Sequence, residues 1–126
     1  MANEFYGVRV AKATYDFDVH GGATGDGQSL GVIVPEGAII MRCTGNVQTT
    51  LASDGSATVA INVGSTELNA ATAFDDATYV AADVHYDTAA SGDTPVVLTS
   101  DSEVNIDIAG AALTAGKYDI YVEYLY

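Results

Sequence analysis

The residues that could act in nucleophilic catalysis are few and lie far apart in this sequence. There are two histidines, His20 and His85, and one cysteine, Cys43. A hydrolytic site needs a nucleophile, a base and a group that orients the base, and these two histidines are the only imidazole bases in the sequence. We therefore expect ordinary structural roles for both histidines, a buried apolar environment for Cys43, and no enzymatic activity.

Carboxylates are the other side chains that could hold a ligand. Zinc needs three or four convergent ligands, and the sequence has no C-x-x-C, H-x-x-x-H or H-E-x-x-H pattern. Calcium takes oxygen ligands, and the candidate carboxylates are Asp16, Asp18, Asp26, Asp54, Asp75 and Asp76. None of these stretches fits the calcium-loop pattern with its closing Glu. The sequence therefore predicts no cofactor or metal, with a calcium site as the open alternative.

The charge balance restricts the partners. Seventeen Asp and Glu stand against four Lys and Arg, for a net charge of −13. Such a chain is repelled by phosphate backbones and by anionic membrane surfaces, so we predict neither nucleic acid nor membrane as a partner. Arg9, Lys12 and Arg42 lie in the first third and only Lys117 lies later. This region could face an acidic partner; a solvated anionic surface without any arrangement is the alternative.

The elements that must position these residues are indicated by a two-residue alternation of apolar and polar side chains. Alternation of this period is typical of strands with one face buried. Strands are expected over Arg9–Val19, Leu30–Val34, Ala38–Leu51, Ala57–Val63, Thr78–Tyr86, Pro95–Thr99, Glu103–Ile108 and Lys117–Tyr126. A bulge or break is expected at Gly45-Asn46, a short helix or crossing loop over Ser65–Asp76, and connections over His20–Gln28, Thr88–Thr94 and Ala109–Gly116.

About eight short strands without a long amphipathic helix predict an all-β fold. We expect an antiparallel β-sandwich that is jelly-roll-like, with an immunoglobulin-like order as the alternative. The immunoglobulin pattern of two Cys and a Trp is absent, because the chain has one Cys and no Trp. The 126 residues suit one domain, predicted as residues 9–126 behind an N-terminal arm of residues 1–8.

Two groups of side chains do not fit a plain core. Phe5 and Tyr6 form an aromatic pair on the predicted arm. Tyr121 and Leu125 fall on the polar face of the last strand, opposite its apolar face. Both groups are candidates for subunit or partner contacts. The alternatives are that the aromatic pair covers one end of the sandwich and that the last strand is buried on both faces.

Several turn and strand motifs give the sequence a family resemblance. They are Ala13-Thr14-Tyr15-Asp16-Phe17, Gly21-Gly22, Leu30-Gly31-Val32, Val34-Pro35-Glu36-Gly37-Ala38-Ile39-Ile40, Gly55-Ser56-Ala57-Thr58-Val59-Ala60-Ile61 and Leu113-Thr114-Ala115-Gly116-Lys117-Tyr118. In these motifs, which run from about Ala11 to Tyr124, the chain resembles the small decoration or cement proteins of tailed-phage capsids. The motifs specify a fold better than a function.

The resemblance implies a location on the outer surface of the virion capsid, and the N-terminal residues, which lack the apolar region of a secretory signal peptide, lead us to expect synthesis in the host cytoplasm. It implies a β-sandwich, often a homotrimer, that binds the major capsid protein and reinforces the shell, without catalytic residues. The net charge agrees with a position outside the DNA-filled shell. The expected capsid-facing group is Phe5, Tyr6, Arg9, Lys12 and Arg42. The alternatives are a carbohydrate-binding or adhesin module and a tail or head-fibre component of the virion.

Overall fold

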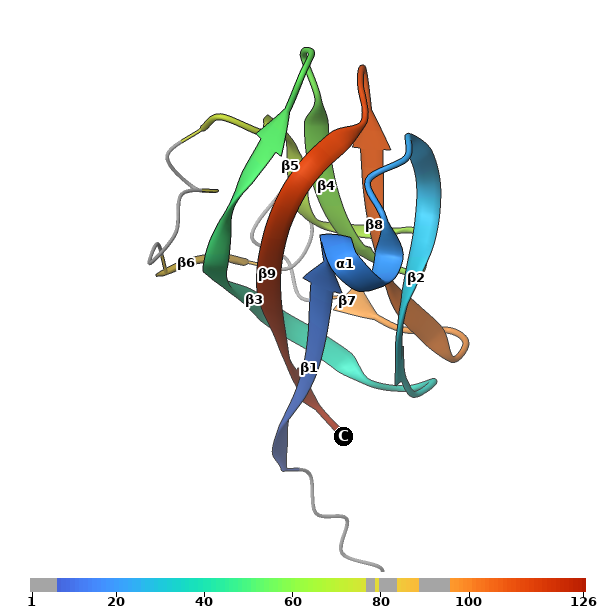
Figure 1. The fold of residues 1–126 in the computed structure, drawn as a ribbon. Coiled ribbons are helices and arrows are strands. Elements are labelled where there is room, and N and C mark those ends of the chain that lie inside the picture. Colours follow the sequence, from blue (N-terminus) through green and yellow to red (C-terminus); the bar gives the residue numbers. More distant parts are fainter. Residues whose placement is uncertain (1–6, 77–78, 80–83, 89–95) are drawn as a thin grey trace, which may run out of the picture.

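The structure is a computed structural model that describes residues 7–76, 79, 84–88 and 96–126, and it consists almost wholly of antiparallel strands (Figure 1). One helical turn, α1, spans Phe17–His20. The strands are β1 (Val8–Asp16), β2 (Gly25–Val34), β3 (Ile39–Ser53), β4 (Thr58–Val63), β5 (Thr66–Ala73), β6 (Val84–Thr88), β7 (Val96–Val97), β8 (Ser102–Ala109) and β9 (Leu113–Leu125).

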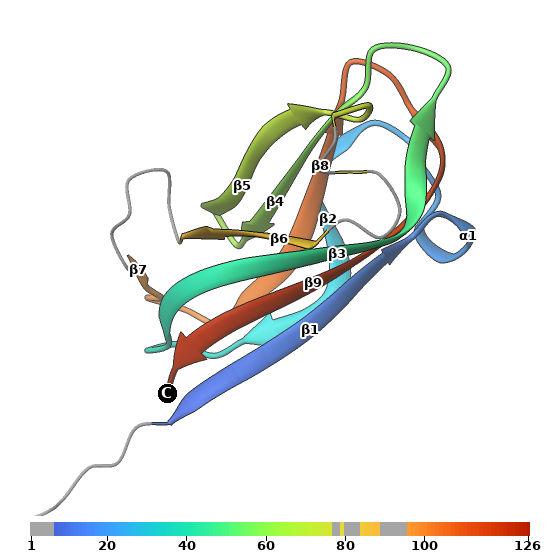
Figure 2. The ribbon, with the colours of Figure 1, turned by 90° about the vertical axis from the view of Figure 1, so that its left-hand side faces the viewer.

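The strands form two sheets that pack face to face (Figure 2). Sheet A has the order β1-β9-β3-β6, with β7 pairing the start of β3, and sheet B has the order β2-β8-β4-β5. Each sheet interleaves early and late strands, so that the first strand of the chain lies beside the last. This is the connectivity of a jelly roll. It confirms the predicted jelly-roll-like sandwich, and the immunoglobulin-like order is wrong.

The core lies between the sheets and is built from the inward positions of the alternating strands. Tyr118, Ile120 and Val122 of β9 are fully buried, as the alternation predicts. Cys43 is 3% exposed, which confirms the expected apolar environment. Burying one large aliphatic side chain contributes about 1.5–3 kcal/mol, so the alternating positions supply most of the driving force for closing the sandwich.

The first predicted strand ends earlier than its alternation suggests. A carboxylate oxygen of Asp16 accepts a hydrogen bond from the backbone N–H of Asp18 at 3.0 Å and caps the helical turn α1. Short polar side chains favour such local caps over extended backbone. The expected strand end at Val19 is therefore wrong, and the Val19 side chain is 75% exposed.

The expectation for Ser65–Asp76 is also wrong, because most of this segment forms strand β5. Leu68 reaches the core, and β5 pairs with β4 at the edge of sheet B. Alanine has only a weakly unfavourable strand propensity, and hydrogen bonding to the adjacent strand β4 overrides it. The expected break at Gly45-Asn46 is likewise wrong: both residues keep register with β9, and the bulges lie on either side.

Other boundaries shift because strand pairing extends beyond the alternating core positions. β2 begins within the predicted connection His20–Gln28, and β9 begins within the predicted connection Ala109–Gly116. β6 covers Val84–Thr88, whereas most of the remaining predicted strand, residues 78–83, lies outside the described residues.

Tyr15 anchors the end of β1 and provides a test of the packing there. Its hydroxyl donates to the carbonyl oxygen of Gly21 at 2.7 Å, and its ring stacks on His20. Burial, and secondarily the nearby charge of Asp16, raises the pKa of Tyr15 to about 12. The folded state therefore holds this proton more tightly than the unfolded chain does, for which the phenol pKa is about 10.

Because the folded-state pKa is the higher one, the contribution of Tyr15 to stability is complete below about pH 10 and is lost as the pH rises toward 12. We expect the free energy of unfolding, measured by chemical denaturation, to fall over this range. The free energy of unfolding of Tyr15→Phe should fall less steeply with pH, because this variant lacks the phenol whose pKa is raised on folding. Equal slopes for both proteins would show that Tyr15 does not titrate differently on folding.

Candidate interaction surface

The outer face of sheet A, meaning the side chains that point away from sheet B, carries an apolar row at one end. Residues directly opposite one another on paired strands project to the same face. Val8 of β1 lies opposite Leu125 of β9, Leu125 opposite Ile39 of β3, and Ile39 opposite Val97 of β7. Val8 is 70% exposed and Val97 is 57% exposed, and the two inner residues are partly exposed. The apolar row therefore crosses four strands.

The next row along the strands combines an apolar side chain with an ion pair. Val10, which is 55% exposed, lies opposite Glu123, and Glu123 lies opposite Arg42. The Arg42 guanidinium donates to both carboxylate oxygens of Glu123, with Nη2 at 3.2 Å from Oε1. This fork-like pairing fixes the orientation of both groups. Met41, the extra residue of a bulge in β3, adds a further exposed apolar side chain.

Farther along the strands the outer face becomes polar and centres on Asp119. Its carboxylate accepts hydrogen bonds from Thr14 Oγ1 at 2.8 Å and Gln48 Nε2 at 3.1 Å. Lys12 Nζ lies 3.9 Å from the same carboxylate and 5.7 Å from the centre of the Tyr121 ring. Asp119 is buried under these donors, and Lys12 lies between its carboxylate and the Tyr121 ring on the surface.

The structure brings together four of the seven predicted contact residues. Lys12, Arg42, Tyr121 and Leu125 share the outer face of sheet A. Arg9 belongs to the opposite face of β1, where its guanidinium lies 6.0 Å from the centre of the Tyr126 ring. Phe5 and Tyr6 lie outside the described residues. The alternative in which β9 is buried on both faces is wrong, since Tyr121 and Leu125 are partly exposed.

Sequence reasoning missed most of the apolar row and its neighbours. Val8 fell within the predicted arm, and Val10, Ile39, Met41 and Val97 were treated as ordinary strand residues. Each is unremarkable alone, because scattered exposed apolar residues are normal. Their significance comes from the register that aligns them, and no local pattern in the sequence encodes that register.

The two sheets differ sharply in charge. All four Lys and Arg of the chain lie on β1, β3 and β9 of sheet A. The strands of sheet B carry no cation and hold Asp26, Glu67, Glu103 and Asp107. On the outer face of sheet B, Asn62 Nδ2 donates to Asn105 Oδ1 at 3.1 Å and to Asp107 Oδ2 at 2.9 Å. One face of the sandwich is thus mixed in charge, and the opposite face is anionic.

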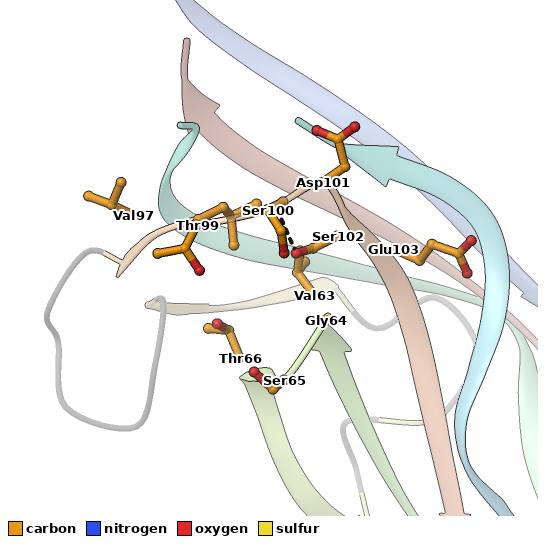
Figure 3. Close-up of a pocket in the computed structure, with 11 residues that line it drawn as sticks. Val63, Gly64, Ser65, Thr66, Val97, Thr99, Ser100, Asp101, Ser102 and Glu103 are labelled. Atoms are coloured by element: carbon orange, nitrogen blue, oxygen red, sulfur yellow. Dashed lines mark hydrogen bonds between the residues drawn. The ribbon is translucent and has the colours of Figure 1, made fainter. Parts of the chain in front are cut away.

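A groove of about 280 Å³ borders the Val97 end of the apolar row. Figure 3 shows hydroxyl side chains around it, from the β4–β5 turn and the first residue of β5 and from the β7–β8 connection and the first residue of β8, namely Ser65, Thr66, Thr99, Ser100 and Ser102. The Ser102 hydroxyl donates to the carbonyl oxygen of Ser100 at 3.0 Å. Asp101 points away from the groove (Figure 3) and accepts a hydrogen bond from the Glu36 N–H at 2.8 Å.

Within the part of the chain that the structure describes, no cluster of three or more His, Cys, Asp or Glu could hold a metal ion. Asp16, one of the calcium candidates, instead caps α1. No described helix has the length and apolar character needed to span a membrane.

The sequence matches no protein-family model and, at a significant level, no curated protein. Among solved structures, a chain of the Cyanophage Pam1 capsid asymmetric unit aligns with a TM-score of 0.63 and 22% identity, over 99% of this chain and 89% of that one. A chain of the acidic stable capsid structure of Helicobacter pylori bacteriophage KHP30 has a TM-score of 0.60 at 21% identity, with 94% and 87% covered. A chain of the capsid of Ralstonia phage GP4 has a TM-score of 0.60 at 19% identity, with 94% and 83% covered. The chain therefore shares its jelly-roll fold with chains found in three phage capsid structures.

Proposed function

We propose that this chain is a virion structural protein that binds the outer surface of a phage capsid and stabilises the shell, without catalysis. The observation that carries the proposal is the outer face of sheet A, where an exposed apolar row adjoins the Arg42–Glu123 ion pair and the Lys12–Tyr121 contact. An apolar centre flanked by polar and charged groups is typical of protein–protein interfaces. The three fold neighbours described above come from phage capsid structures and support the choice of partner.

The charge distribution gives the proposed orientation. Sheet A, which holds all the cations, faces the capsid, and the anionic sheet B faces solvent. The net charge of −13 favours the outside of the particle, since packaged DNA would repel the chain. Net charge far from zero also limits association between free copies in solution.

The proposed partner is the major capsid protein, and the proposed assembly on the shell is a homotrimer. In this arrangement Lys12, Arg42, Tyr121 and Leu125 contact the capsid through the outer face of sheet A. Phe5 and Tyr6 precede β1 in the sequence and Arg9 lies at its start, and all three are proposed as contacts with the capsid or with a neighbouring subunit. The protein is proposed to be made in the host cytoplasm before it joins the virion.

Co-sedimentation of the purified chain with undecorated phage capsids tests the proposal, with mass photometry of the free chain alongside. We expect saturable binding in a fixed ratio to capsid subunits and a higher temperature of capsid disruption after binding. No binding across a range of salt concentrations would contradict the proposal. A specific signal on a glycan array would then favour the carbohydrate-binding alternative.

A further inference from the structure

The outer edge of β1 presents backbone groups that no described strand pairs. β1 lies at the end of sheet A and pairs only with β9, through nine consecutive residue pairs without a register shift. By contrast, β2 at one edge of sheet B has two register shifts and two glycines with positive φ, Gly27 and Gly31. Bulges of this kind protect sheet edges against further pairing. β1 lacks that protection and is a regular template for another strand.

The pairing with β9 determines which backbone groups of β1 face this edge. The N–H groups of Gly7 and Tyr126 each donate to the carbonyl oxygen of the other, at 3.3 and 3.2 Å. In an antiparallel pair such doubly bonded positions alternate with positions whose N–H and C=O point away from the partner. The outward-pointing positions of β1 are therefore Val8, Val10, Lys12 and Thr14.

The far end of the same edge is already occupied. Asp16 continues the outward-pointing series, and its N–H donates to His20 Nδ1 at 3.1 Å. The near end is open: Val8 is 70% exposed and Val10 is 55% exposed. Both ribbon views show the start of β1 and the end of β9 projecting beyond the rest of the sandwich (Figures 1 and 2). The accessible stretch thus runs from Val8 to about Lys12.

Charge determines which strand fits this edge. Arg9 and Lys12 flank Val10 in the accessible stretch, which itself contains no carboxylate, and Lys12 lies 3.9 Å from the carboxylate of Asp119 on β9. Pairing β1 of two copies over this stretch would bring four cations together, and edge charges of one sign oppose such self-pairing. A strand with carboxylates would instead neutralise them. Val8 and Val10 also offer apolar contacts on the same face as the apolar row.

We propose that the outer edge of β1 accepts an extended acidic segment of the capsid protein as an additional strand of sheet A. This proposal rests on the proposed function and deepens it. Main-chain hydrogen bonds to Val8, Val10 and Lys12 supply binding energy that depends little on side-chain identity, and the flanking cations supply selectivity. The added strand lies beside the apolar row, so both contacts belong to one continuous capsid-facing surface.

The test compares Val10→Pro with Val10→Ala in co-sedimentation with undecorated capsids. Both variants lose the valine side chain, but only proline removes the N–H that points to the free edge, and proline is tolerated at such edge positions. We expect Val10→Pro to bind at least tenfold more weakly than Val10→Ala, roughly the effect of losing one well-placed hydrogen bond and its neighbours. Equal binding by the two variants would overturn strand addition while leaving capsid binding in place.

Hydrogen exchange of the wild-type chain, followed by mass spectrometry with and without capsids, gives a second measurement that needs no substitution. We expect exchange at the amides of Val8, Val10 and Lys12 to slow on binding, and unchanged exchange there would overturn the proposal.

If Val10→Pro fails to fold, Lys12→Pro is compared with Lys12→Ala in the same co-sedimentation experiment. If the proline variant instead has a smaller free oligomer and unchanged capsid binding, the edge of β1 pairs with a second copy of the chain and the proposal is wrong. Failure of the wild type to bind capsids would contradict the proposed function itself.

Discussion

Leu125→Asp is expected to weaken binding to undecorated capsids by about 100-fold. Leu125 lies in the middle of the apolar row, between Val8 and Ile39. Contact with the capsid would bury the new carboxylate without a cation in its own row, and an unpaired buried charge is strongly unfavourable. Because Leu125 is only partly buried in the free chain, the free energy of unfolding should change little. Co-sedimentation measures the first effect, and chemical denaturation measures the second.

Ile33→Asp provides the matched control. Ile33 is also an exposed aliphatic residue, but it lies on β2 in sheet B. The same kind of substitution there adds one negative charge to the face that is proposed to point to solvent. We expect wild-type capsid binding for this variant. Loss of binding in Ile33→Asp together with normal binding in Leu125→Asp would show that sheet B, and not sheet A, faces the capsid.

Gly22→Ala is expected to lower the free energy of unfolding by about 3 kcal/mol, the upper end of what overpacking normally costs. A Cβ atom at Gly22 would overlap the carbonyl oxygen of Leu113, and the N–H of Leu113 donates to the carbonyl oxygen of Gly22 at 2.8 Å. The added atom meets backbone, so no side-chain rotation relieves the overlap. The connection after α1 must therefore move away from the start of β9. Urea denaturation followed by far-UV circular dichroism measures the loss.

Gly27→Ala is the control for a glycine replaced where there is space. Gly27 has a φ of +65° and no neighbouring atom within 4 Å of an added Cβ. Only the backbone conformation is penalised, which costs about 1–2 kcal/mol. A larger loss for Gly27→Ala than for Gly22→Ala would mean that backbone conformation, and not the close approach to Leu113, makes glycine necessary in this part of the molecule.

The alternation of side chains determined which face of a strand each residue occupies. In β9 it correctly separated Tyr118, Ile120 and Val122, which are buried, from Tyr121 and Leu125, which lie on the outer face. A strand has a side-chain period of two, so the assignment to a face follows from sequence wherever one face is apolar. The same reasoning gave the all-β class, and the composition gave the strong negative charge.

Local competition and strand pairing limited the prediction of the elements themselves. The alternation continued through Val19, yet the cap formed by Asp16 turned the chain into α1. The segment containing Leu68 resembled a short helix or loop, yet β4 offered it a partner and it became β5. In both places the secondary structure depended on a specific hydrogen-bonding partner, and residue propensities do not identify that partner.

By itself the sequence determined the fold class, the acidity of the chain and the outward position of Tyr121 and Leu125. Only the tertiary structure decided that Val8, Leu125, Ile39 and Val97 form one row across four strands. These residues come from both ends and the middle of the chain, and their alignment depends on long-range register. The register between these strands is set when strands that are distant in the sequence come together and all bury their apolar faces in the same core. For that physical reason, a contact surface assembled across a sheet becomes visible only after the strands are paired.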